Sequence, residues 1–207
     1  NPDEAVFYTS GRTTNEAAFL YQLFVREFGT SNLPDCSNMC HEASGSALTE
    51  TLGIGKGSVT LDDLYKAELV IVVGQNPGTN HPRMLSALEK CKNNGGKIIS
   101  VNPLPEAGLI SFVNPQNPAK LLTGGTKLTD VFVPIMINGD VAFFKALLIK
   151  LLEKEETEGQ VFDWDFIKEH THGYDEFISD LKTYDFNACL QAAGISEAVF
   201  NEAFELV

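Results

Sequence analysis

Two short apolar runs, at residues 69–73 and 97–101, stand out in the pattern of hydrophobic and polar positions along the chain. Both are dominated by Leu, Val and Ile and bounded by polar residues, which is typical of strands covered on both faces. Residues 82–93 between them have helical spacing and are followed by Gly95 and Gly96, which predict the end of a helix. Strand, helix and strand in this order predict a right-handed crossover between parallel strands.

A further strand and helix are predicted at the start of the chain. Residues 5–9 are expected to form a buried strand, and residues 10–12 supply a turn after it. Thr14 is then a suitable N-cap for a helix with a wide apolar face, which Gly29 ends. We interpret this segment as the first strand-and-helix unit of a sheet.

The remaining elements are mostly helical. Thr60, with Asp63 three positions later, predicts a capping box at the start of a short helix. Residues 131–137 form a short apolar run, and residues 140–153 carry Phe and Leu side chains on a helical period. From residue 163 onward the pattern predicts several short helices.

These elements predict an α/β fold. We expect a mainly parallel, doubly wound, Rossmann-like sheet with helices on both faces and a helical C-terminal part. Residues 1–155 are expected to form the α/β domain. Residues 156–207 are expected to be a helical extension packed on the same domain.

Composition narrows the class of partner. The 207 residues are 43% hydrophobic and 21% charged, and 28 acidic against 15 basic residues give a formal charge of -13. This charge disfavours nucleic acid or an anionic membrane as a partner.

No apolar stretch reaches the roughly 20 residues that cross a bilayer, so no membrane insertion is expected. With four cysteines and no signal-like start, we expect a cytoplasmic protein, and the start inside an apparent strand predicts a trimmed chain.

Polar loops follow the predicted strands, where doubly wound sheets bind their ligands. They comprise residues 10–12, 74–82 and 102–105. The middle loop offers glycines for close backbone approach together with amide and hydroxyl groups, which suits a polar, phosphate-bearing ligand. The alternative is that its Gly and Asn residues serve turn geometry only. The chain has no G-x-G-x-x-G or Walker sequence, so an ordinary nicotinamide or nucleoside triphosphate site is not supported.

A second candidate site lies in residues 35–42, which hold two thiols, an imidazole and two carboxylates. A thiolate suits a soft transition metal, and His41 next to Cys40 can accept a proton near neutral pH. Zinc is disfavoured because the spacing is unusual and no second ligand pair is evident. The two cysteines could instead be buried apolar residues, and a hydrolase with Cys40 as nucleophile is a third, weaker alternative.

Four ordered motifs, which together are far more specific than any one of them, carry a resemblance to a known family. They are SGRTTNE at residues 10–16, DCSNMCHE at 35–42, GQNPGTNHPR at 74–83 and VNPLPE at 101–106. In this order they resemble the alpha, or large, subunits of formate-dehydrogenase-like molybdopterin oxidoreductases. The similarity runs along nearly the whole chain. It implies an internal fragment from the first part of the molybdopterin oxidoreductase domain.

The resemblance implies a molybdenum or tungsten centre held by two pterin guanine dinucleotides, with electrons passing through a 4Fe-4S cluster. Cys40 matches the family's metal ligand and His41 its proton acceptor, so both are the implied catalytic residues. The motifs also imply that residues 1–155 form a cofactor-binding domain. The implied cofactor-binding residues lie in the strand-end loops and before the helix at residue 140: Arg12, Gly74, Gln75, Asn76, Pro77, Thr79, His81, Asn102, Pro103, Gly139 and Asp140.

The chain also departs from the family pattern. Asn102-Pro103-Leu104 stands where formate dehydrogenases often carry Asp-Pro-Arg, and the spacing before Cys40 is one residue shorter. The cysteines that bind the iron-sulfur cluster are absent from this chain.

The resemblance also implies a function for the parent protein, which would transfer electrons between a small substrate and a carrier. The implied partners of this chain are the remaining domains of the parent and an electron-carrier protein. The fragment alone is expected to be inactive, and a stand-alone nucleotide-binding module without catalysis is the alternative.

Overall fold

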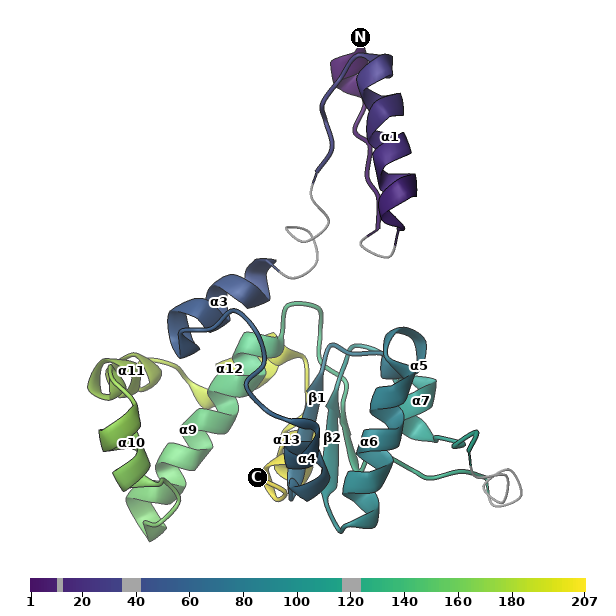
Figure 1. Cartoon of the computed structure of the whole chain (residues 1–207). Helices are drawn as coiled ribbons and strands as arrows, with labels where there is room; N and C mark the ends of the chain where they lie inside the picture. The colour runs from purple at the N-terminus through teal and green to yellow at the C-terminus, as the bar shows by residue number, and fades with distance from the viewer. Residues whose placement is uncertain (11–12, 35–41, 117–123) are drawn as a thin grey trace. The chain divides into compact units, whose positions relative to one another are not determined.

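The computed structural model describes residues 1–10, 13–34, 42–116 and 124–207. The chain divides into two compact units, Asn1–Val59 and Thr60–Val207, and each is described by itself (Figure 1).

The first unit is built around helix α1, Asn15–Phe28. The hydroxyl of Thr14 accepts a hydrogen bond from the backbone N–H of Ala17 at 3.3 Å and caps the helix. Gly29 ends it with φ of 104°, in the left-handed region. The predicted cap and stop of this helix are thereby confirmed. A 3-10 turn η1, Pro2–Glu4, precedes α1, and helix α3, Glu42–Leu52, follows it in the chain.

The predicted strand at residues 5–9 is wrong. The segment is extended, but only Phe7 makes a backbone ladder bond, from its N–H to the carbonyl of Asn32 at 2.9 Å. Val6 and Tyr8 are 68% and 52% exposed, so the segment is not buried either. Its apolar pattern serves ring packing instead, because Phe7 lies edge-on to aromatic rings of α1. A strand needs a paired neighbour, which the apolar pattern alone does not supply.

The second unit holds the sheet, and here the predicted elements are confirmed. Helix α4, Leu61–Lys66, starts at Thr60 with the predicted capping box. Strand β1, Leu69–Val73, helix α6, Pro82–Asn93, and strand β2, Lys97–Val101, have the predicted bounds. Two four-residue helices lie in the loops after the strands, α5, Pro77–Asn80, and α7, Ala107–Ile110. The run at residues 131–137 forms only the short strand β3, Val131–Val133.

The sheet is parallel with order β1-β2-β3, and helices cover both of its faces (Figure 1). Ile98 of β2 packs with Leu85, Leu88 and Leu109 of helices α6 and α7 on one face. Its neighbour Ile99 faces the other side, since side chains alternate along a strand. This confirms the predicted α/β class with a parallel, helix-covered sheet.

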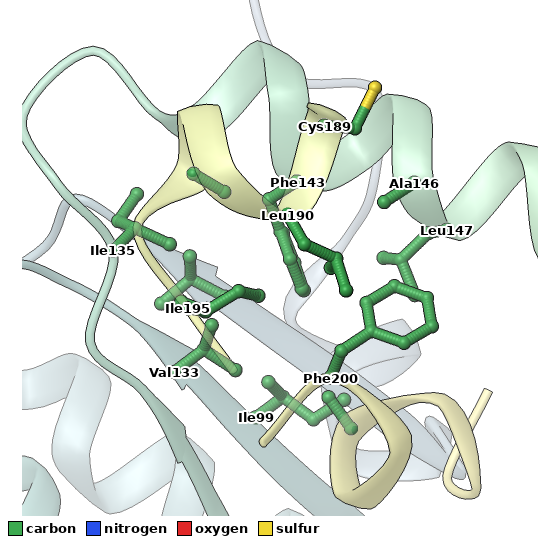
Figure 2. Close-up of a cluster of buried hydrophobic side chains, with 13 residues drawn as sticks. Ile99, Val133, Ile135, Phe143, Ala146, Leu147, Cys189, Leu190, Ile195 and Phe200 are labelled. Atoms are coloured by element: carbon green, nitrogen blue, oxygen red, sulfur yellow. The ribbon is translucent and has the colours of Figure 1, made fainter. Parts of the chain in front are cut away.

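The opposite face of the sheet is covered by the C-terminal helices. Phe143 of α9, Asp140–Glu158, packs with Leu190 of α12, Phe186–Ala193, and Phe200 of α13, Glu197–Phe204, over Ile99 and Val133 (Figure 2). Helices α10, Trp164–His170, and α11, Tyr174–Leu181, complete the predicted helical part. Helix α9 continues past residue 153, where its periodic apolar pattern stops.

The expected boundary between residues 155 and 156 lies inside helix α9. Helices α12 and α13 beyond it share one apolar core with the strands. The division into compact units falls between Val59 and Thr60. In the described part of the chain, no helix has the length and apolar character needed to cross a membrane.

Candidate functional site

The loops after the three strands leave the sheet from one edge. Val73, Val101 and Val133 are the last strand residues, and Val101 is in register with both neighbours. The first residues of the loops after β1 and β2 prolong the ladder: the N–H of Gly74 donates to the carbonyl of Val101 at 3.0 Å, and that of Asn102 to the carbonyl of Val133 at 3.2 Å. Parallel strands therefore bring loops far apart in sequence to the same place, the position where ligands of such sheets bind.

The loop after β1 turns sharply at Gly74. Its φ is 61°, which favours glycine, and a Cβ built there meets no atom within 4 Å. The following Asn76 caps α5, because its Oδ1 accepts from the N–H of Thr79 at 3.2 Å. Pro77 is buried beneath this turn. The Asn76 cap and buried Pro77 therefore fix the loop in position. The backbone at Gly74 is open, so a bulky polar ligand can approach the chain closely there.

Asn102 holds the loops after β1 and β2 together. It is 3% exposed, and its Nδ2 donates to the carbonyl of Gln75 at 3.1 Å and to the hydroxyl of Ser100 at 3.4 Å. A buried amide that satisfies a loop carbonyl fixes the position of that loop. In this structure Asn102 therefore acts on the site by positioning Gln75.

A second link joins the same two loops. The Nδ2 of Asn76 donates to Oε2 of Glu106 at 2.5 Å, and both side chains are half-buried. Gly78 and Gly108 lie against each other beside this bond: a Cβ on Gly108 would be 3.2 Å from the Cα of Gly78. These contacts hold α5 next to α7. Because Asn76 both caps α5 and pairs with Glu106, the oxygen and the nitrogen of its amide each have a partner within the protein.

Several other predicted ligand contacts point outward. Gln75, Thr79, His81 and Pro103 are exposed, and within the described ranges no side-chain hydrogen bond is assigned to the first three. They supply an amide, a hydroxyl and an imidazole around the open turn at Gly74. These groups can donate to or accept from a polar ligand without breaking an internal bond.

The loop after β3 is the third loop at this edge of the sheet. Asn138 has a φ of 68°, and Gly139 is buried so tightly that a Cβ would lie 2.9 Å from the carbonyl oxygen of Met136 and 3.0 Å from Ala193. Gly139 is the N-cap residue of α9 and offers no side-chain cap, and Asp140 is half-buried in the first turn. Packing alone thus requires glycine at position 139, independently of the predicted cofactor contact.

Three residues of the predicted site lie outside the described residues: the metal ligand Cys40, the proton acceptor His41 and the cofactor contact Arg12. Among the residues that the structure does describe, no group of three or more His, Cys, Asp or Glu side chains could hold a metal ion. Cys91 and Cys189 are buried as expected of packing residues, and burial raises the pKa of both thiols.

Glu106 is the site residue that sequence reasoning left out. It occurs in the VNPLPE motif, but no residue pattern marks its pairing with Asn76, which is 30 positions away. Glu106 also lines a pocket of about 250 Å³ beside β2 and β3, here called the β2–β3 pocket. The other lining residues are Ser100, Pro105, Leu109, Ile110, Lys127, Thr129, Asp130 and Phe132.

Comparison with known sequences shows what the chain is similar to. An uncharacterized oxidoreductase of Mycobacterium tuberculosis is 56% identical over 199 residues, which cover 96% of this chain and 26% of the relative. Protein YdeP of Escherichia coli is 44% identical over 98% of this chain and 27% of its own length. The alpha subunit of F420-dependent formate dehydrogenase 1 of Methanococcus maripaludis is 25% identical, over 100% of this chain and 27% of the subunit. No family model matches the chain.

The chain therefore spans about a quarter of the length of the curated relatives that it matches. Among solved structures, acetylene hydratase from Pelobacter acetylenicus has a TM-score of 0.62 at 15% identity, over 98% of this chain and 24% of the hydratase. This likeness concerns the fold alone. The matches confirm the resemblance that the four motifs indicated: the chain is similar to a segment of larger, formate-dehydrogenase-like oxidoreductases.

Proposed function

We propose that this chain is the segment of a molybdopterin-dependent oxidoreductase of the formate dehydrogenase type that binds the guanosine diphosphate part of a pterin guanine dinucleotide. The observation that carries the proposal is the joining of the loops after β1 and β2 by the Asn102–Gln75 and Asn76–Glu106 bonds. A rigid, polar edge of this kind suits a large phosphorylated ligand, since the joined loops lose little conformational entropy when the ligand binds.

The described residues fit the nucleotide part of such a cofactor. Gly74 leaves its backbone open, and Gln75, Thr79 and His81 offer exposed polar groups beside it. Pro103 and the Gly139–Asp140 turn lie at the ends of the other two strands, and each would contact the cofactor from its own side. Asn76 and Asn102 would serve the site chiefly by holding the loops in place.

The metal-binding part of the proposal falls on residues outside the described ranges. Cys40 would supply a thiolate, the soft ligand that molybdenum or tungsten accepts, and His41 would hold or accept a proton beside it. Arg12 would offer a positive charge to the anionic cofactor. The bound group would supply the two-electron redox chemistry, for which the protein provides binding and orientation.

The parent protein would pass electrons between a small substrate and a carrier. A 4Fe-4S cluster, the remaining domains and an electron-carrier protein would all come from outside this chain. Formate is not the favoured substrate, because Asn102-Pro103-Leu104 replaces the Asp-Pro-Arg that formate dehydrogenases often carry. This replacement removes one acidic and one basic group next to the site.

Calorimetry of this chain with guanosine diphosphate tests nucleotide binding directly. We expect weak binding that is lost on Gly74→Val, because a branched side chain disfavours the positive φ and covers the open backbone. Gly159→Val is the matched control, since Gly159 also has a positive φ, 69°, a Cβ there meets no atom within 4 Å, and the residue lies away from these loops in sequence. No heat from a folded sample would contradict the proposal.

The redox part is tested on the protein extended by its flanking segments. We expect it to contain molybdenum or tungsten and to oxidise a small substrate with a dye as acceptor, and Cys40→Ala to abolish this oxidation. An extended protein that is free of metal yet binds guanosine diphosphate would support a stand-alone nucleotide-binding module instead.

A further inference from the structure

We infer that the chain has a second ligand site, which binds a small organic acid consisting of one carboxylate and an apolar body. The site is a pocket of about 650 Å³ between helices α4 and α6, here called the α4–α6 pocket. Its wall is formed by residues of α4, by residues within 82–87 at the start of α6 and by residues of the segment 112–116. None of the predicted contacts of the pterin cofactor lies in this wall, so the inference goes beyond the proposed function.

Helix α6 is joined to both other parts of the wall by its side chains. The Nζ of Lys90, in α6, lies 3.8 Å from the ring centroid of Tyr65 in α4. The Oε2 of Glu89, a buried residue of α6, accepts a hydrogen bond from Nδ2 of Asn114 at 2.8 Å. The pocket is therefore formed before a ligand binds, and its volume is within the range of small-molecule sites.

Much of the wall is apolar and suits the body of such a ligand. Ala87 and Phe112 are buried, Leu64 and Met84 are half-buried, and all four line the pocket. Leu61 of the same wall is 56% exposed, so an apolar group that covers it removes both surfaces from water. Met84 has an unbranched, flexible side chain, which adapts to the shape of a bound apolar chain.

Arg83 supplies the charge that selects a carboxylate. Among the described residues of the wall it alone is charged at neutral pH, and none is Asp or Glu. Within the described ranges its side chain has no ion pair or hydrogen bond. A guanidinium binds a carboxylate through two parallel hydrogen bonds. In a chain with a net charge of -13, an unpaired guanidinium beside apolar side chains therefore marks a local site for an anion.

The remaining polar groups of the wall are neutral. Ser86 and Gln116 are exposed and offer a hydroxyl and an amide, Tyr65 offers a phenol, and Asn114 is bonded to Glu89. With one guanidinium as its charged group, the wall matches the single charge of a carboxylate better than the nearly double charge of a phosphate monoester. The expected ligand is therefore a monocarboxylate.

Titration of the isotope-labelled chain with octanoate, followed by its backbone amide resonances, tests both the binding and its location. We expect saturable shifts at residues of the wall such as Leu64, Ala87 and Phe112. The expected Kd is on the order of 1 mM, the value that the ligand efficiency of drug-sized molecules gives for about ten heavy atoms. Octanol, which has the same apolar body without the carboxylate, is titrated in parallel.

The variant Arg83→Met separates the charge from the apolar wall. It keeps an unbranched side chain but loses the positive charge, so octanoate should bind about fivefold more weakly, the upper end for an exposed ion pair. Octanol should bind as to wild type, and Arg83→Lys should retain most of the affinity for octanoate. Lys168→Met is the charge-matched control, because it removes an exposed positive charge from α10, which contributes no residue to the wall.

The variant Ser86→Trp tests whether the pocket itself is the site. Ser86 is exposed in α6, so a large side chain there fills the pocket without entering the core. The shifts caused by octanoate and by octanol should both disappear, while thermal unfolding stays close to that of wild type.

Three outcomes would overturn the inference. The first is the absence of saturable shifts with octanoate, and the second is an affinity for octanoate that neither Arg83→Met nor Ser86→Trp lowers. The third is displacement of octanoate by guanosine diphosphate, which would place the carboxylate at the strand-end loops instead. The first two leave the proposed function standing, because that function is judged by the binding of guanosine diphosphate itself.

Discussion

The side-chain amide of Asn102 donates to the backbone carbonyl of Gln75 at 3.1 Å and so joins the loop after β2 to the loop after β1. The bond is nearly inaccessible to water, since Asn102 is almost completely buried. A buried hydrogen bond of this kind contributes little net energy but is costly to break, because one partner is left unsatisfied.

We predict that Asn102→Asp is destabilising and that its cost depends on pH. A carboxylate cannot donate to Gln75, and burial beside a carbonyl would raise the pKa of the new side chain. The native state would then hold a proton that the unfolded state releases. Relative to wild type, the variant should lose stability as pH rises through about 4, and by about 1–3 kcal/mol at pH 7.

Urea unfolding between pH 3.5 and 8, followed by the fluorescence of Trp164, measures this cost in the unit that holds the sheet. Asn201→Asp, at an exposed position in α13, is the control and should stay close to wild type. A variant Asn102→Asp as stable as wild type at pH 8 would contradict the positioning role of Asn102.

We predict that Asp130 supports the opposite end of β2 and that acid removes this support. Asp130 pairs with Lys92 at 2.6 Å and accepts from the N–H of Ile98 at 2.8 Å. Burial alone would raise the pKa of Asp130, but the bonds from Lys92 and Ile98 outweigh it and hold the pKa below its ordinary value. The unfolded state therefore binds the proton more readily, and stability rises with pH.

The stabilising effect of Asp130 should be complete above the ordinary carboxyl pKa of about 4 and disappear as pH falls through its lower folded value. Asp130→Asn should cost about 1–3 kcal/mol at pH 7, since Lys92 is left largely buried without its partner. The difference from wild type should shrink on acidification. Glu156→Gln, which removes an exposed pair, should change stability by under about 1 kcal/mol. A pH-independent difference would refute this account.

We predict that Gly96 is required by close packing at the end of α6. A Cβ at this position would lie 2.4 Å from Sγ of Cys91 and 2.6 Å from the carbonyl oxygen of Ala67. The carbonyl belongs to the backbone and cannot move aside cheaply, so Gly96→Ala should destabilise the unit by about 1–3 kcal/mol. Thermal unfolding measures this, with Gly57→Ala as the control in open space. An unchanged melting temperature for Gly96→Ala would mean that the chain relaxes around the new methyl group.

The predicted site was only partly visible in the sequence. The loops around Gly74 and Asn102 were identified because polar and glycine residues follow buried strands, and the structure brings these loops together. Their ligand contacts stay predictions, as do those of Arg12, Cys40 and His41. Glu106 was missed because its partner Asn76 lies 30 residues away, on a loop that only packing brings near.

What the sequence determined by itself is local. The caps at Thr14 and Thr60 and the stop at Gly29 depend on bonds and dihedral angles within a few residues, so they could be read directly. Strands β1 and β2 were also visible, because burial on both faces favours a run dominated by Leu, Val and Ile. Only the tertiary structure decided that residues 5–9 stay unpaired and that Asn76 joins Glu106. Pairing needs a second segment at the right place, and its position follows from the packing of the whole unit.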